Sequence, residues 1–136
     1  MAREISSSKP GILVVDDDDG IRGMVAFYLD RHGYTVWQAA NGQEAVEVYQ
    51  QHRDAIAVVL LDVRMPGLDG PQALQALRVI NPEIRCCFMT GESGPYTLEE
   101  LYRLGAIRVF RKPFASLPEL VQVLGELVQG KIDPCT

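Results

Sequence analysis

Short apolar runs alternate with helical stripes along the whole chain. Runs of strand length, each bounded by turn residues, lie at residues 12–15, 34–39, 57–61, 85–89 and 107–110. Between them, apolar residues recur three and four positions apart, as they do on one face of a helix. The clearest stripe is the last one, formed by Leu117, Leu120, Val121, Leu124, Leu127 and Val128. The pattern predicts five strands that alternate with five helices.

Helix boundaries are indicated by capping residues and by glycine and proline. We expect helices to start at Asp18 or Asp19, at Asn41, after Gly70 and near Pro95. We expect four of the helices to end at Gly33, at Asn81-Pro82, at Gly105 and at Gly130. Strict alternation of strand and helix is typical of parallel β-α-β units, with helices on both faces of the sheet.

The size and composition fit a single α/β domain. The chain has 136 residues, with 47% hydrophobic and 23% charged residues. We expect a flexible lead-in over residues 1–9, a domain over residues 10–130 and a short tail over residues 131–136. No run approaches the roughly 20 apolar residues of a membrane helix, and the polar start is not a secretory signal, so we expect a cytoplasmic protein. A net charge of −5 argues against direct nucleic-acid binding.

Carboxylates stand at the ends of two of the apolar runs. Asp62 closes the run that starts at Val58, and Asp16-Asp17 follow the first run directly. All strands of a parallel sheet end at one edge, where open α/β folds bind ligands. Three carboxylates crowded there repel one another, and a divalent cation with oxygen ligands relieves the repulsion. The sequence therefore predicts a divalent-metal or phosphoryl site.

Two further polar side chains reach the same edge. Thr90 follows the fourth run and precedes Gly91, and Lys112 follows the fifth. A hydroxyl at Thr90 can donate to a phosphoryl oxygen. An ammonium at Lys112 can pair with Asp62 when the site is empty and with a phosphoryl group when it is filled.

These motifs together resemble the receiver domain of two-component response regulators, including the chemotaxis regulators. The resemblance covers about residues 11–129. It rests on Val15-Asp16-Asp17, Leu61-Asp62, Met65-Pro66-Gly67 with Asp69-Gly70, Met89-Thr90-Gly91, and Lys112-Pro113-Phe114. Each motif is weak alone, but their order and their position at strand ends make the set specific. The resemblance implies a flavodoxin-like, doubly wound (βα)5 fold with strand order 2-1-3-4-5.

The resemblance also implies roles for individual residues. Asp62 would be the phosphoacceptor, Thr90 the switch hydroxyl, and Lys112 the lysine that contacts the phosphoryl group. Asp17 would bind Mg²⁺ (or Mn²⁺) directly and Asp16 directly or through water, with Asp62 and the backbone carbonyl of Arg64 as further ligands.

The implied activity is signalling rather than turnover of a substrate. A sensor histidine kinase or a histidine phosphotransfer protein would donate the phosphoryl group. The surface of the last two helices and the last strand would then change its affinity for a downstream effector. A phosphorylation-dependent homodimer is an open possibility, and no contact with nucleic acid or membrane is implied.

Two positions depart from the family pattern or invite a special role. The family usually has Tyr or Phe three residues before the lysine, where this chain has Val109 followed by Phe110. We therefore expect switching through Thr90 without an aromatic rotamer, because strand neighbours point to opposite faces. Arg64 and Glu92 occupy positions that tune hydrolysis in the family, and they either pair across the site or remain solvated at its rim.

Three other functions compete with a phosphoacceptor. A haloacid-dehalogenase-type phosphatase needs a carboxylate two residues after its nucleophile, where this chain has Arg64. A flavodoxin-like nucleotide or flavin binder needs a phosphate loop after the first strand, where this chain has four aspartates. A phosphorylation-independent interaction module is the third alternative, and the intact set of site residues argues against it. Whatever its function, the chain is either a stand-alone receiver or the N-terminal receiver cut from a longer transcription regulator.

Overall fold

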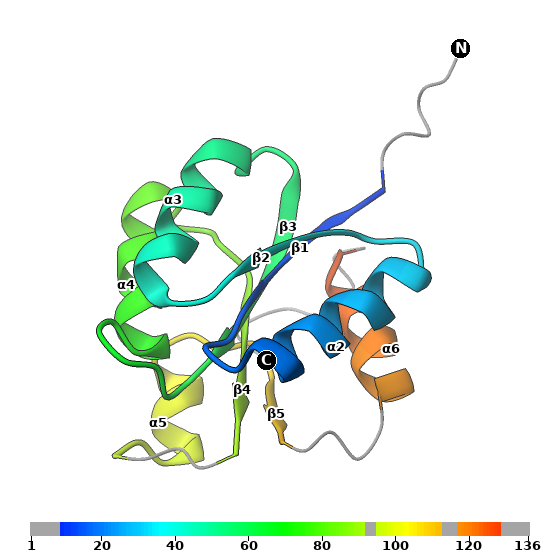
Figure 1. Ribbon diagram of the computed structural model, residues 1–136. Helices are drawn as coiled ribbons and strands as arrows, with labels where there is room; N and C mark the ends of the chain where they lie inside the picture. Colours follow the sequence, from blue (N-terminus) through cyan, green and yellow to red (C-terminus); the bar gives the residue numbers. More distant parts are fainter. Residues whose placement is uncertain (1–8, 92–94, 113–116, 129–136) are drawn as a thin grey trace.

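Five parallel strands form one sheet, and helices cover both of its faces (Figure 1). The computed structural model describes residues 9–91, 95–112 and 117–128. The strands are β1 (Gly11–Val15), β2 (Thr35–Ala39), β3 (Ile56–Asp62), β4 (Cys86–Thr90) and β5 (Val109–Arg111). The helices are α2 (Asp19–Arg31), α3 (Gly42–His52), α4 (Gly70–Ile80), α5 (Leu98–Arg103) and α6 (Leu117–Val128). The sheet order is β2-β1-β3-β4-β5, so the predicted fold class and strand order are confirmed.

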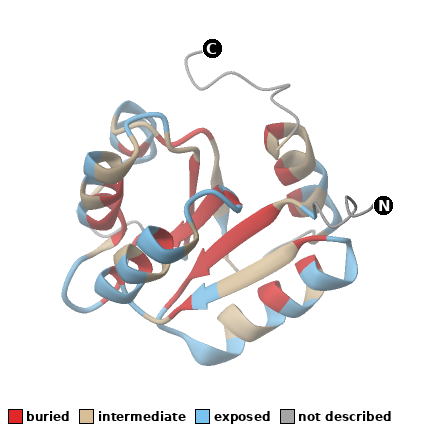
Figure 2. Cartoon of the chain, turned by 90° about the horizontal axis from the view of Figure 1, so that it is seen from above, coloured by how far each residue is buried: buried red, intermediate tan, exposed pale blue. Residues whose placement is uncertain are grey.

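The core consists of two apolar layers separated by the sheet. One layer packs α3, α4 and α5 against the sheet through residues such as Tyr49, Leu74 and Leu101. The other packs α2 and α6 against the opposite face through residues such as Leu29 and Leu124. Figure 2 shows the buried strands between these two helical layers. Burial on both faces explains why the central strands read as continuous apolar runs.

Side chains alternate between the two layers along each strand. On β4, Phe88 lies in the layer of α3, α4 and α5, whereas Cys87 and Met89 lie in the layer of α2 and α6. This alternation follows from the two-residue period of a strand. It fixes the face on which each strand-end residue emerges, and thereby the composition of the site.

Local capping sets most of the helix starts that the sequence predicts. Asp18, rather than Asp19, caps α2 by accepting a hydrogen bond from the Ile21 amide. Asn41 caps α3 in the same way through the Glu44 amide. Among the described residues, none of the helices combines the length and the apolar character needed to cross a lipid bilayer.

The starts of two elements differ from the prediction by two residues or more, whereas the other strand boundaries differ by one residue at most. Helix α5 begins at Leu98 rather than near Pro95, because Thr97 and Glu100 form a capping box that fixes the first turn there. Strand β5 covers Val109–Arg111, although the apolar run begins at residue 107. The predicted helix end at Gly130 and most of the predicted lead-in and tail fall outside the described residues.

Candidate phosphoacceptor site

Four strands deliver polar side chains to one edge of the sheet. Asp16 follows β1, Asp62 ends β3, Thr90 ends β4 and Lys112 follows β5. The Lys112 amide donates to the Thr90 carbonyl over 2.9 Å, which extends the pairing of β4 and β5 to the last of these residues. The structure thus brings together side chains that lie up to about 96 positions apart in the chain, as the strand-end argument predicts.

The ammonium of Lys112 bridges two buried carboxylates. Its Nζ lies 2.8 Å from Asp16 Oδ2 and 3.2 Å from Asp62 Oδ1. Asp16 is fully buried and Asp62 is 5% exposed. The sequence predicts the contact with Asp62, and the shorter contact with Asp16 adds a second anchor for the lysine. Two carboxylates share one cation here, so negative charge remains in excess.

The excess negative charge affects the pKa values of the site. Burial, and next the negative charge of Asp16, raise the pKa of Asp62 to about 7, although Lys112 opposes the shift. Burial alone would lower the pKa of Lys112, but its hydrogen bond to Asp16 and the charges of Asp62 and Asp16 outweigh burial and raise it. Lys112 therefore stays charged, while Asp62 is only partly ionised near neutral pH.

The donor set fits a divalent cation. Asp16, Asp17 and Asp62 each offer a carboxylate oxygen, and these oxygens lie within 4.8 Å of one another. Asp17 is exposed and the other two are buried, so the cluster opens toward solvent on one side. Oxygen ligands from one or two carboxylates suit Mg²⁺, which keeps several of its waters. The part assigned to the Arg64 carbonyl stays a prediction.

Short-range contacts hold the first acidic pair in place. The Asp18 amide donates to Asp16 Oδ1 over 2.9 Å, and Arg22 donates to the Asp16 carbonyl over 2.8 Å. Arg22 also pairs with the exposed Asp19 at 2.7 Å. Sequence reasoning did not single out Arg22, although its place one turn into a helix that follows four aspartates is a usable signal.

The backbone of Asp62 lies close to Gly70 at the start of α4. The Gly70 amide donates to the Val63 carbonyl over 2.8 Å, which holds the start of α4 against the end of β3. A Cβ at Gly70 would lie 2.5 Å from the Asp62 carbonyl oxygen and 2.9 Å from the Val63 Cα. Only glycine permits this approach without a backbone shift.

Thr90 carries a buried hydroxyl without a hydrogen-bond partner among the described residues. The residue is 3% exposed, and its Oγ1 is fully buried. A buried hydroxyl that makes no hydrogen bond costs about 1–3 kcal/mol. Such a group is expected where a ligand supplies the missing partner.

Val109, three positions before Lys112, lies on the same face of the sheet as Thr90. Val109 packs against the α3, α4 and α5 layer, whereas Phe110 packs against the α2 and α6 layer. The backbone amide of Val109 donates to the Tyr102 hydroxyl over 3.2 Å. Phe110 therefore does not lie beside Thr90. The hypothesis that switching uses Thr90 without rotation of an aromatic side chain stays a prediction.

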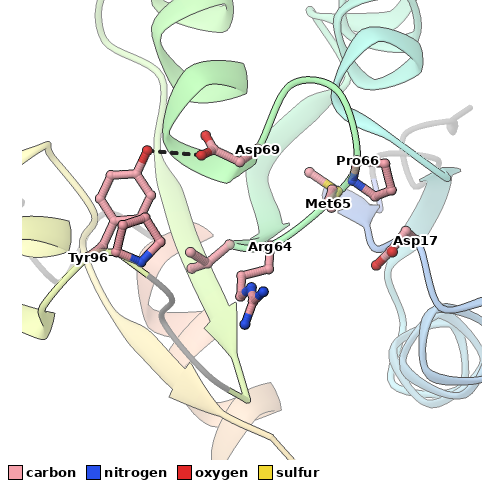
Figure 3. Close-up of a pocket in the computed structure, with 8 residues that line it drawn as sticks. Asp17, Arg64, Met65, Pro66, Asp69 and Tyr96 are labelled. Carbon is pink, nitrogen blue, oxygen red and sulfur yellow. Dashed lines mark hydrogen bonds between the residues drawn. The ribbon is translucent and has the colours of Figure 1, made fainter.

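A cleft of about 490 Å³ lies beside the acidic cluster (Figure 3). Its lining includes Asp17, Arg64 and Met65, and at its far side Asp69 and Tyr96. The Tyr96 hydroxyl donates to Asp69 Oδ2 over 2.9 Å. Sequence reasoning missed this pair, because the residues are 27 positions apart and no motif joins them. The predicted pairing of Arg64 with Glu92 involves a residue outside the described ranges.

Comparison with known proteins gives one consistent result. The family model of the response regulator receiver domain matches residues 12–125. Sporulation initiation phosphotransferase F of Bacillus subtilis is 39% identical over 103 residues, which cover 76% of this chain and 82% of that protein. The autoinducer 1 sensor kinase/phosphatase LuxN of Vibrio campbellii is 34% identical over 122 residues, which cover 90% of this chain but only 14% of that protein.

A solved structure agrees with both sequence relatives. Chemotaxis protein CheY4 of Vibrio cholerae superposes with a TM-score of 0.79 at 31% identity, covering 88% of this chain and 98% of that one. The match includes the strand ends at which Asp16, Asp62, Thr90 and Lys112 lie, since all four fall within residues 12–125. The chain belongs to the response regulator receiver domains of two-component signalling.

Proposed function

We propose that this receiver domain accepts a phosphoryl group on Asp62. One observation carries the proposal: the Lys112 ammonium lies within hydrogen-bonding distance of Asp62 and Asp16. A carboxylate held beside a fixed cation, at an edge that opens to solvent through Asp17, has the surroundings that an incoming phosphoryl group needs.

The chemistry follows from the positions of the side chains. A phosphohistidine of a sensor kinase or a phosphotransfer protein presents its phosphoryl group, and an Asp62 oxygen attacks the phosphorus in line. The P–N bond breaks, an acyl phosphate forms, and the electron pair returns to the imidazole of the donor. Lys112 then exchanges its contact with Asp62 for one with a phosphoryl oxygen. Water later hydrolyses the acyl phosphate.

A divalent cation completes the site in this proposal. Asp16, Asp17, Asp62 and the Arg64 carbonyl are the residues that would hold Mg²⁺ or Mn²⁺. The bound cation supplies positive charge to the oxygens of the transferring group. A cation there would also offset the repulsion by Asp16 that, after burial, raises the pKa of Asp62.

The downstream response to phosphorylation depends on Thr90 in this proposal. Its buried hydroxyl lacks a partner among the described residues, and a phosphoryl oxygen on Asp62 offers one. We propose that movement of Thr90 toward Asp62 alters the surface formed by α5, β5 and α6, and with it the affinity for an effector or a second receiver. The domain limits at residues 10 and 130 and a cytoplasmic location stay predictions, as does a role as a signalling protein rather than an enzyme.

Intact mass spectrometry tests the acceptor. After incubation with acetyl phosphate or phosphoramidate and Mg²⁺, the mass of the wild type should rise by one phosphoryl group, and Asp62→Ala should show no rise. Asp30→Asn, an exposed carboxylate on α2, is the matched control and should react like the wild type. A wild type that gains no mass from either donor favours the alternative of an interaction module that works without phosphorylation.

A further inference from the structure

Helix α5 is tied to α4 at both of its ends. At the C-terminal end, the Arg78 guanidinium of α4 donates to the carbonyls of Leu104 and Gly105. At the N-terminal end, the Tyr96 hydroxyl donates to Asp69 Oδ2 (Figure 3). Arg78 makes two hydrogen bonds to a chain reversal at which Gly105 has a φ of +113°. The N-terminal tie is a single hydrogen bond at the rim of the cleft.

Asp69 is fixed relative to the acceptor. Its Oδ1 accepts the Gln72 amide, and the Gln72 side chain accepts the Asp69 amide, so the residue is held in a capping box at the start of α4. The next residue, Gly70, is hydrogen-bonded to Val63 and packed against the Asp62 carbonyl. Asp69 therefore has little freedom to follow a movement elsewhere in the site.

Tyr96, in contrast, belongs to the part that the switch acts upon. It lies directly before Thr97, the N-cap of α5, and six residues after Thr90. The hydrogen bond to Asp69, then burial and then the negative charges of Asp69 and Glu100 raise the pKa of Tyr96, so the phenol stays protonated and continues to donate. A hydrogen bond fails once its heavy atoms separate beyond about 3.5 Å, so a small displacement of the α5 end breaks this contact.

We infer that Tyr96 is a positioning residue whose hydrogen bond to Asp69 holds the N-terminal end of α5 against α4 in the unphosphorylated state. The observed bond coexists with the Lys112–Asp62 contact and with an unpartnered Thr90 hydroxyl, which together define that state. When Thr90 moves toward a phosphoryl group, the bond breaks, and α5 swings about the end that Arg78 retains. This inference rests on the proposed function.

Thermodynamic linkage predicts in which direction loss of the Tyr96 hydroxyl shifts the equilibrium between the two states. A contact made in one of two states biases the equilibrium toward that state. Removing the Tyr96 hydroxyl should therefore favour the phosphorylated state. A single hydrogen bond corresponds to about a five-fold change, the equivalent of about 1 kcal/mol.

The test compares Tyr96→Phe with wild type in two assays. The first measures the rate of phosphorylation by acetyl phosphate with Mg²⁺, and the second measures binding of beryllium fluoride, a stable phosphoryl mimic, with Mg²⁺. We expect a rate and an affinity about five-fold above those of the wild type. Tyr49→Phe is the matched control, because it also loses a phenol, one that accepts from Asn81 at the C-terminal end of α4, away from the cleft. It should change urea stability without changing rate or affinity.

A second variant assigns the effect to the bond itself. Asp69→Ser keeps an oxygen that can cap α4 but lacks the second oxygen that accepts from Tyr96. It should accelerate phosphorylation in the same direction, and Tyr96→Phe should add nothing when the two changes are combined. Additive effects would show that the two residues act separately and would overturn the inference.

The outcomes separate this inference from the proposed function. A wild type that is phosphorylated on Asp62 while Tyr96→Phe behaves identically overturns the inference alone. A slower Tyr96→Phe reverses its sign and overturns it as well. A wild type that accepts no phosphoryl group and no beryllium fluoride overturns both.

Discussion

The Lys112 ammonium lies closer to Asp16, at 2.8 Å, than it does to the proposed acceptor Asp62. Asp16 is completely buried and also accepts the Asp18 amide, so it is the best-fixed member of the acidic cluster. In the proposed mechanism, this contact keeps the lysine at the site while its bond to Asp62 is exchanged for one to a phosphoryl oxygen. Asp16 thus serves both as a metal ligand and as an anchor for the lysine in the proposed mechanism.

The double role of Asp16 leads to a prediction for Asp16→Asn. The variant loses one carboxylate from the cation site, so we expect its Mg²⁺ affinity to fall by about tenfold or more, equivalent to about 1.4 kcal/mol. Isothermal titration calorimetry measures the affinity. Asp19→Asn, which removes an exposed charge from the same acidic run, is the control and should change the affinity much less. Equal losses in the two variants would indicate a general charge effect rather than a ligand.

The pKa of Asp62 predicts how stability depends on pH. Since this pKa is raised to about 7, the folded protein binds the proton more tightly than the unfolded chain, whose aspartates titrate near about 3.9. Asp62 therefore stabilises the fold fully only below about pH 4, and its contribution is lost as the pH rises through about 7. In EDTA at pH 8, Asp62→Asn should be more stable than the wild type by on the order of 2–4 kcal/mol.

Urea unfolding at several pH values checks this expectation. The difference between Asp62→Asn and the wild type should shrink steadily on acidification and vanish well below about pH 4, where the wild-type carboxyl is protonated in both states. A difference that stays constant between about pH 4 and pH 8 would contradict the raised pKa. Added Mg²⁺ at pH 8 should stabilise the wild type more than the variant.

Thr90→Val should separate stability from switching. Valine has nearly the shape of threonine but lacks the hydroxyl, which has no partner among the described residues. We expect urea stability to be unchanged or to rise by up to about 1–2 kcal/mol, because an unsatisfied buried group is removed. The phosphorylated variant should nevertheless lose the change in effector or receiver affinity, measured by calorimetry or size-exclusion chromatography with multi-angle scattering. A destabilised variant that still switches would contradict the proposed role.

Phe110→Leu tests whether an aromatic ring takes part in switching. Phe110 packs with the α2 and α6 layer, so a smaller side chain should lower the free energy of unfolding by about 1 kcal/mol. Phosphorylation rate and the response of the output surface should stay as in the wild type, because the ring lies on the face opposite Thr90. A variant with normal stability but a lost response would place the ring in the switch after all.

Much of the site follows from the sequence because parallel strands share one edge. The apolar runs locate β1, β3 and β4, and the residues that end them, Asp16, Asp62 and Thr90, converge once the strands are parallel. The position of Lys112 at the same edge follows from the fifth apolar run. These inferences use the period of a strand and the direction of the chain, both of which are local properties of the sequence.

The contacts that escaped sequence reasoning depend on tertiary packing. The bond between Tyr96 and Asp69 and the one from Arg78 to the end of α5 join residues more than 25 positions apart. Which rotamer each side chain adopts is decided by the packing of α4 against α5, and no periodic pattern encodes it. The start of α5 is different, because its signal is local: the Thr97–Glu100 capping box competes with Pro95 as a start signal, and the capping box decides.

The contact of Gly70 with the Asp62 backbone also limits how this chain can be redesigned. A library that randomises position 70 while keeping residue 62 should return glycine almost alone, since even a methyl group meets the main-chain oxygen at 2.5 Å. Attempts to change the lifetime of a phosphoryl group on Asp62 must therefore alter exposed residues of the cleft, such as Arg64, and leave Gly70 unchanged.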